Sequence, residues 1–279
     1  MTGPSLFGSA SGRDSGRDMS HEMGLDMGHT SASATNIWTA MAAAGLAVWA
    51  TQAPAADWYT GAAPPRPNSD WIVAVDASAT VTSTSQFAAV SGTFAAAGPL
   101  NQSGPRIRLE GLAGTYRFDA VPGISVKGDQ AGGAVLAGYQ WIAPRSSFAA
   151  YGGITIRDSQ FSGPAAVLPA SNVQEGFKGA FEYYATPTDR TMIFAYGAYS
   201  TIYNAYYSRL KFGVATLGHA YVGPEVSALG DDFYRQWRVG AHVTGLQMGG
   251  LQFGLSAGYE IDRVGKGGAY GTLDVRASY

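Results

Sequence analysis

The side chains that could do chemistry in this sequence are ionisable groups that alternate with apolar residues. In RIRLEGLAGTYRF, Arg106, Arg108 and Glu110 occupy every second position, with Ile107 and Leu109 between them. Period 2 is the side-chain period of a β-strand, so these charged groups share one face of a sheet. The ionisable residues that follow the rule are Arg106, Arg108, Glu110, Lys178, Glu182, Arg209, Lys211, Arg238, His242, Glu260, Asp274 and Arg276.

This charged set admits two interpretations. Opposite charges could pair and fill the interior of a barrel, or the polar face could line a path or binding surface for a polar chain. Saccharide recognition would add aromatic rings beside hydrogen-bonding groups. The tyrosines that could supply such rings, or could instead belong to an interface belt or to the core, are Tyr203, Tyr206, Tyr207, Tyr221 and Tyr234.

Signatures of catalysis and of metal binding are scarce. The chain has no cysteine, and its histidines lack the spacing of a metal site. GLSAG, residues 254–258, matches G-x-S-x-G, but it lies inside a segment of period 2 and lacks the strand-to-helix turn of a nucleophile elbow. Adjacent Asp231 and Asp232 could bind Ca²⁺ weakly, although a solvated turn is the simpler interpretation. We therefore expect no cofactor, no metal and no enzyme activity. The alternative of an outer-membrane hydrolase or acyltransferase would need a Ser or Asp beside His219 or His242.

Segments with period 2 must position these side chains. They are roughly 9–14 residues long, whereas soluble strands average about 5–6 residues and membrane-crossing strands need about 9–11. We predict an all-β fold, an antiparallel transmembrane up-and-down β-barrel of about twelve strands. The count would fall to ten or eleven if DASATVTSTSQF formed one long strand or part of a plug. The predicted strands cover residues 71–80, 84–97, 105–118, 131–142, 147–157, 174–186, 190–203, 206–215, 219–226, 233–246, 250–261 and 269–279.

The predicted connections alternate in length. APRSS, TPTD and QMGG are short, whereas DAVPGISVKGDQ, DSQFSGPAAVLPASN, SALGDD and RVGKGG are longer. Outer-membrane barrels have short periplasmic turns and longer external loops. The pattern therefore predicts a Gram-negative outer-membrane protein with both barrel termini in the periplasm. The terminal aromatic residue, Tyr279, is the predicted signal for the barrel-insertion machinery.

Alternation alone does not separate a membrane barrel from a soluble secreted β-sandwich, so composition has to decide. Charged residues make up 14% of the chain, against about 25% in soluble domains. Aromatic residues gather at segment ends, where an interfacial girdle would lie: Tyr116, Phe118, Trp141, Tyr183, Tyr184, Trp237, Tyr259 and Tyr279. Both features favour a barrel with outer-membrane lipid outside and polar groups inside. A formal net charge of −2 disfavours a nucleic-acid partner.

The N-terminal part predicts a targeting segment. IWTAMAAAGLAVWATQA, residues 37–53, is the longest mostly apolar stretch, and small residues follow it. This arrangement is typical of a secretory signal, although an N-terminal anchor helix is the alternative. We predict a leader and signal peptide over 1–56, cleaved after Ala56, a Pro-rich linker over 57–70 and the barrel over 71–279.

Four stretches carry a family resemblance: RIRLEGLAGTYRF, GPEVSALGDDFYRQWRVGAHVTGL, LSAGYEID and GAYGTLDVRASY. They resemble the cellulose biosynthesis protein BcsS family over residues 57–279, without a catalytic signature. The resemblance implies an outer-membrane barrel from cellulose-synthesis gene clusters, with cellulose or cellulose-secretion components as partners. It leads us to predict a non-enzymatic accessory role in export, anchoring or surface organisation of the glucan. A general small-solute porin is the alternative.

Overall fold

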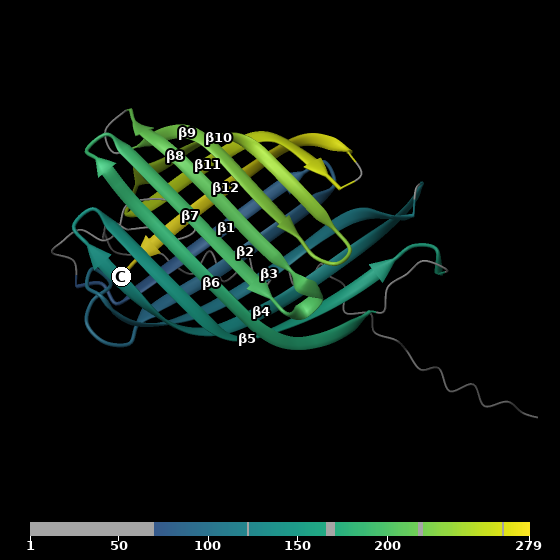
Figure 1. The fold of residues 1–279 in the computed structure, drawn as a ribbon, viewed down its shortest axis with the longest axis horizontal. Coiled ribbons are helices and arrows are strands. Elements are labelled where there is room, and N and C mark those ends of the chain that lie inside the picture. The colour runs from purple at the N-terminus through teal and green to yellow at the C-terminus, as the bar shows by residue number, and fades with distance from the viewer. Residues whose placement is uncertain (1–69, 122, 166–170, 217–219, 264) are drawn as a thin grey trace, which may run out of the picture. The chain divides into compact units, whose positions relative to one another are not determined.

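The computed structural model describes residues 70–279, apart from 122, 166–170, 217–219 and 264. Its strands form a closed antiparallel barrel in which each strand pairs with its neighbours in sequence (Figure 1). The strands are β1 (Val73–Thr82), β2 (Ser85–Ala95), β3 (Gly104–Val121), β4 (Ile124–Ala143), β5 (Ser146–Ser162), β6 (Asn172–Thr188), β7 (Thr191–Ser200), β8 (Tyr206–Ala215), β9 (Tyr221–Gly230), β10 (Arg235–Met248), β11 (Leu251–Asp262) and β12 (Gly267–Ser278). The predicted barrel of twelve strands is confirmed, and the alternatives of ten strands and of a sandwich are wrong.

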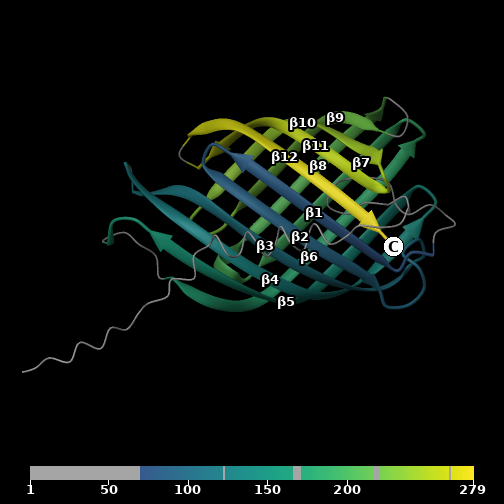
Figure 2. The same ribbon diagram turned by 180° about the vertical axis from the view of Figure 1, so that it is seen from behind.

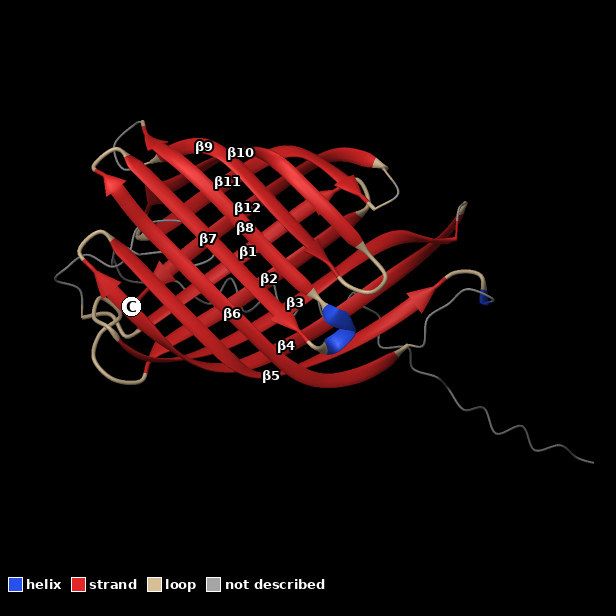
Figure 3. Ribbon diagram, in the orientation of Figure 1, coloured by secondary structure: helices blue, strands red, loops and turns tan. Residues whose placement is uncertain are grey.

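Helical structure has a minor part in the described residues. A 3-10 turn, η2 (Ile202–Asn204), lies between β7 and β8 (Figure 3). Across the described ranges, we find no helix with the length and apolar character needed to cross a membrane.

The barrel closes where its first and last strands meet. Figure 2 shows β1 beside β12 with the C-terminus at the end of the seam. Ala74 lies opposite Ser278, and the backbone N–H of Tyr279 donates to the carbonyl of Val73 at 2.9 Å. Closure removes the free sheet edges that lipid does not tolerate.

The side-chain distribution is inside-out compared with a soluble sheet. On β3, Ile107 and Leu109 are exposed on the outer surface, whereas Arg106 and Arg108 are fully buried inside. The same alternation runs along β8, β10, β11 and β12. An apolar outer face and a polar interior suit a barrel surrounded by lipid.

Part of the predicted aromatic girdle lies on the outer surface. Its exposed members are Trp141, Tyr183, Trp237, Tyr259 and Tyr279. The prediction is wrong for Tyr116, Phe118 and Tyr184, which are buried inside the barrel. These three share the inward parity of their strands, which places them among the core residues.

The strands from β3 to β6 are longer than a membrane crossing requires. Figure 1 shows their paired ends reaching beyond the other strands. DAVPGISVKGDQ, predicted to be a loop, is mostly strand, because β3 and β4 stay paired out to Val121 and Ile124. The outward residues there, such as Arg117 and Lys127, are exposed and polar, so the sequence loses its apolar alternation while the backbone ladder continues. The hairpin therefore extends past the apolar belt.

Other connections fit the prediction better. The turns at 144–145, 189–190 and 249–250 are short, as APRSS, TPTD and QMGG indicated. The prediction of a loop at SALGDD is wrong in part, because β9 continues to Gly230 and the connection consists of residues 231–234. The three short turns lie at the end of the barrel that holds Tyr279. The predicted alternation of lengths is nevertheless wrong in part, because the connection 83–84 at the opposite end is equally short and the connection 96–103 at the end of Tyr279 is longer.

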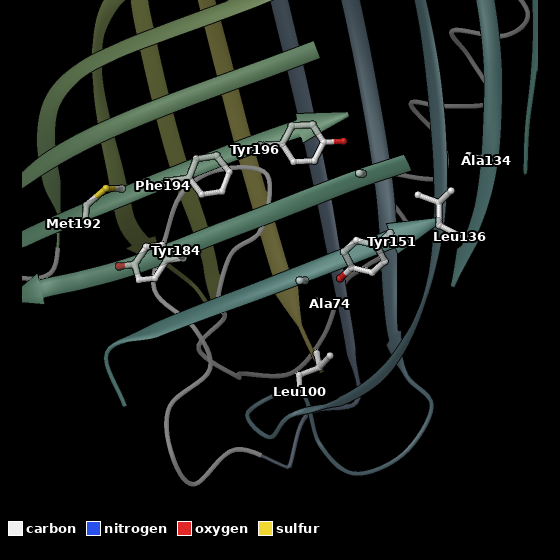
Figure 4. Packing of buried hydrophobic residues seen from close by; sticks show 11 residues of the cluster. Ala74, Leu100, Ala134, Leu136, Tyr151, Tyr184, Met192, Phe194 and Tyr196 are labelled. Atoms are coloured by element: carbon white, nitrogen blue, oxygen red, sulfur yellow. The ribbon is translucent and has the colours of Figure 1, made fainter. Parts of the chain in front are cut away.

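Apolar residues fill the interior at both ends. Figure 4 shows Met192, Phe194 and Tyr196 in a row along β7, facing the same cluster as Tyr151 and Leu100. A second cluster lies at the opposite end and consists of Tyr116, Phe118, Val126, Phe161 and Tyr234. Ionic groups occupy the space between the two clusters.

Candidate functional site in the barrel interior

The first ionic cluster centres on Arg108 of β3. Its Nη1 atom donates to the carboxylate of Glu182 on β6, and its Nε atom lies 3.1 Å from Oε1 of Glu110. Glu110 also pairs with Lys178, and the guanidinium of Arg108 lies 5.3 Å from the ring centre of Tyr151. Because β3 and β6 are not neighbours, the Arg108–Glu182 pair crosses the interior.

The second cluster places Arg209 of β8 between two carboxylates. Its Nη2 atom lies 3.0 Å from Oε2 of Glu225 and 3.0 Å from Oδ2 of Asp274 on β12. The Nζ atom of Lys211 lies 3.4 Å from Asp274 and 3.7 Å from Glu225. Ser256 donates to Glu225 at 2.7 Å. This cluster also joins strands that are not neighbours, so it ties the two sides of the barrel together.

Two further pairs extend the network. Arg238 lies 3.6 Å from Glu260, which also accepts a hydrogen bond from the side chain of Gln236. On the seam, Arg276 lies 3.5 Å from Asp76 of β1. Buried ion pairs satisfied in this way hold a fixed geometry, because a charge left alone in the interior would be costly.

Arg106 has a different role, since it binds the connection between β2 and β3. Its Nε atom donates to Oε1 of Gln140 at 2.8 Å, and Nη2 donates to the carbonyls of Gln102 and, at 3.4 Å, Pro99. Leu100 in this connection is fully buried and belongs to the apolar cluster of Figure 4. Residues 96–103 therefore fold into the end of the barrel that holds Tyr279.

His242 does not form the pair that the hydrolase alternative requires. Its Nδ1 atom lies 2.8 Å from the hydroxyl of Thr244 and its Nε2 atom 3.1 Å from the carbonyl of Phe212. Both ring nitrogens thus face groups other than a Ser or Asp, deep in the interior. His219 lies outside the described residues. Within the described ranges, no cluster of three potential metal ligands occurs.

A cavity of about 240 Å³ lies between the ionic clusters and the aromatic cluster at the end of the barrel opposite Tyr279. Glu110 and Lys178 line it on one side, and Tyr116 and Tyr234 line it on the other. It reaches the connections after β7 and β9, through Ile202 and other loop residues. The lining therefore combines charged pairs, phenol rings and small side chains.

The tyrosines considered for saccharide recognition separate into three groups. Tyr206, Tyr207 and Tyr234 line the cavity. Tyr203 lies in η2, where its ring packs against Phe233 at a centroid distance of 4.9 Å. Tyr221 packs against the apolar cluster at the other end of the barrel and is not part of the cavity lining.

An ion pair holds the loop over this cavity. Arg157 of β5 lies 2.8 Å from Oδ2 of Asp231, whose Oδ1 accepts the backbone N–H groups of Phe233 and Tyr234 at 2.9 and 3.0 Å. Asp231 is only 8% exposed, so its interpretation as a solvated turn residue is wrong. Burial raises the pKa of Tyr234 above its ordinary value. Asp232, the second aspartate, accepts from the side-chain amide of Asn204.

The structure places all of the predicted interior residues inside the barrel, although Glu110 and Lys178 border the cavity and are less buried than the others. The sequence analysis missed two carboxylates of the network, Asp76, which pairs with Arg276, and Glu225, which pairs with Arg209. Both alternate with exposed valines, Val75 and Val226, so the same period-2 rule could have found them.

Comparison with known proteins adds a family to this geometry. A family profile described as cellulose biosynthesis protein BcsS matches residues 77–279. No curated protein sequence matches the chain. Among solved structures, the KdgM porin has a TM-score of 0.43 and 10% identity, covering 74% of this chain and 99% of that one. CdiB from Acinetobacter baumannii has a TM-score of 0.37 and 9% identity, covering 75% and 60%.

The family match starts inside β1 and continues to the last residue, so it takes in nearly the whole barrel and all of the ionic network except Asp76. The resemblance seen in the sequence is confirmed. This chain belongs to the cellulose biosynthesis protein BcsS family.

Proposed function

We propose that this protein is a non-enzymatic outer-membrane barrel of the cellulose-synthesis apparatus that supports export, anchoring or surface organisation of the glucan. Family membership associates the chain with cellulose biosynthesis. The exposed apolar outer face supports a position in outer-membrane lipid. The proposal places the barrel termini in the periplasm. The proposal includes a signal peptide cleaved after Ala56 and a linker over 57–70, which lie outside the described residues except for Asp70.

The observation that carries the proposal is the ionic network that crosses the interior. Arg108–Glu182 and Arg209–Asp274 each join strands that are not neighbours, and all four side chains are buried. Side chains that bond to each other across a barrel fill it as a core would, so the middle of this barrel does not resemble a water-filled porin. We infer that contact with the glucan or with a secretion partner occurs at the outer end and its loops.

A deletion strain and the purified barrel test the proposal together. We expect deletion to reduce the cellulose held at the cell surface, and the wild-type barrel to show no stable porin conductance in planar bilayers. Arg108→Ala or Arg238→Ala should raise conductance and lower surface cellulose, whereas Arg145→Ala, at an exposed pair, should do neither. Normal surface cellulose in the deletion strain, together with porin conductance of the wild type, would favour the porin alternative.

The proposed orientation can be tested because the chain has no cysteine of its own. Lys127→Cys lies on the long β3–β4 hairpin, and Asp189→Cys lies in a short turn at the opposite end. A membrane-impermeant thiol reagent on intact cells should label Lys127→Cys alone. Labelling of Asp189→Cys alone would reverse the orientation.

A further inference from the structure

The charged side chains that line the cavity, in the half of the barrel away from Tyr279, are each paired with a charge of opposite sign. Glu110 is paired with Lys178, and Arg157 is paired with Asp231 at 2.8 Å. Arg238, which also lines the cavity, is paired with Glu260 outside it. A site for an anionic ligand would offer arginine or lysine donors to the ligand instead of internal carboxylates. The lining therefore suits a neutral ligand.

The remaining lining groups combine aromatic faces with hydrogen-bonding atoms. Tyr116, Tyr207 and Tyr234 contribute phenol rings, and Gln130 contributes an amide. The side-chain carbonyl oxygen of Gln130 is buried and has no hydrogen-bond partner among the described residues. A buried acceptor of this kind calls for a donor, which a ligand hydroxyl could supply. A pyranose ring offers such hydroxyls at its rim and an apolar C–H face for stacking on a tyrosine.

The cavity exists because its wall is built from small residues. Leu112 of β3 lies between Ala89 of β2 and Gly132 of β4, and all three line the cavity. Leu112 has the same inward parity as Arg108 and Glu110, yet 38% of its surface is exposed. Its exposure is therefore toward the cavity, whose volume of about 240 Å³ is near the lower limit of ligand pockets, about 300 Å³.

We propose that this cavity binds a short segment of a neutral β-linked glucan, held by the tyrosine rings and the Gln130 amide. The inference rests on the proposed function and specifies its ligand. The arrangement would let the barrel hold a glucan end at the outer side of the membrane without conducting it through the filled middle.

The test fills the cavity without breaking an ion pair. Leu112→Trp places a large side chain in the cavity, whereas the matched control Leu109→Trp places the same side chain on the outer face of the same strand. Each detergent-solubilised barrel is titrated calorimetrically with cellohexaose and with the anionic tetragalacturonate. We expect saturable cellohexaose binding to the wild type and to Leu109→Trp, at least tenfold weaker binding to Leu112→Trp, and weaker binding of tetragalacturonate.

Several results would overturn the assignment. They are no saturable binding of cellohexaose to the wild type, equal affinity in Leu112→Trp, or a preference for tetragalacturonate. A boiling-dependent gel shift confirms that each variant is folded, and Ala198→Leu, which also narrows the cavity, replaces Leu112→Trp if that variant does not fold. The cellulose phenotype of the deletion strain tests the proposed function separately. A retained phenotype without oligosaccharide binding would refute only the glucan site.

Discussion

Replacement of Arg209 by methionine would show how much the ionic network stabilises the barrel. Methionine keeps much of the length of the side chain but removes its charge. In the wild type, Arg209 is 3% exposed and bonds to Glu225 and Asp274, each at 3.0 Å. After the substitution the two carboxylates would retain Lys211, at 3.7 and 3.4 Å, as their nearest cation.

The size of the effect follows from burial. Removing one partner of a buried ion pair costs about 3–5 kcal/mol, because the remaining charge stays in the interior uncompensated. The matched control is Arg145→Met, which breaks a pair of similar geometry, 2.9 Å from Asp189, whose side chains are 57% and 88% exposed. Exposed pairs contribute about 0–1 kcal/mol. Both variants remove an arginine that pairs with carboxylate, two of them for Arg209 and one for Arg145, and the pairs differ most in burial.

The assay is reversible urea unfolding of the barrel in lipid vesicles, followed by tryptophan fluorescence. We expect the free energy of unfolding to fall by about 3–5 kcal/mol for Arg209→Met and by less than about 1 kcal/mol for Arg145→Met. A double variant, Arg209→Met with Glu225→Gln, should recover part of the loss because it removes one stranded charge. Equal losses for the two single variants would refute the view that the interior is a dry ionic core.

Three further predictions follow from other parts of the barrel. Val135 lies on the outer face in the apolar stretch of β4, and Ser125 lies beyond that stretch. In vesicles, the free energy of unfolding should fall by about 2–4 kcal/mol for Val135→Arg and by about 0–1 kcal/mol for Ser125→Arg. Equal losses would contradict the apolar belt. Arg106→Ala should remove about 1.5–3 kcal/mol of charged hydrogen bonding and release residues 96–103. This connection should then become sensitive to protease. Unchanged protection from protease would show that Leu100 alone holds the connection in place. Burial raises the pKa of Tyr234. The stabilising contribution of Tyr234 is therefore complete below its ordinary pKa near 10.0 and is lost as the pH rises through its pKa in the folded state. Limited proteolysis of 231–234 should increase in that pH range in the wild type and not in Tyr234→Phe.

The sequence could predict which face each side chain takes, because that property is local. On β11 and β12, alternation alone places Glu260, Asp274 and Arg276 inside, as the structure does. It could not predict which charges meet, because pairing depends on the register of strands around the whole barrel. Arg209 of β8 reaches Asp274 of β12 only because closure brings the two strands across from each other.

Strand ends were harder to predict where the environment changes. Beyond the apolar belt, the outward face of a strand is solvated, as a turn is. Polar residues such as Lys127 and Asp129 therefore predict a loop, although their backbone is paired in a strand. The cavity could not be predicted from the sequence either. It depends on the small residues Ala89 and Gly132 lying beside Leu112, which is a property of cross-strand register.

The seam between β1 and β12 has a consequence for how the protein is made. Ser78 donates to Asp274, a residue 196 positions further along the chain, so this contact forms only after nearly the whole barrel has been synthesised. Until then both end strands present unpaired edges, and the apolar outer face has no lipid to cover it. An unfinished barrel of this design is prone to aggregate in water. Folding and entry into the membrane are therefore expected to occur as one late event, with the chain kept unfolded by chaperones until its last strand arrives.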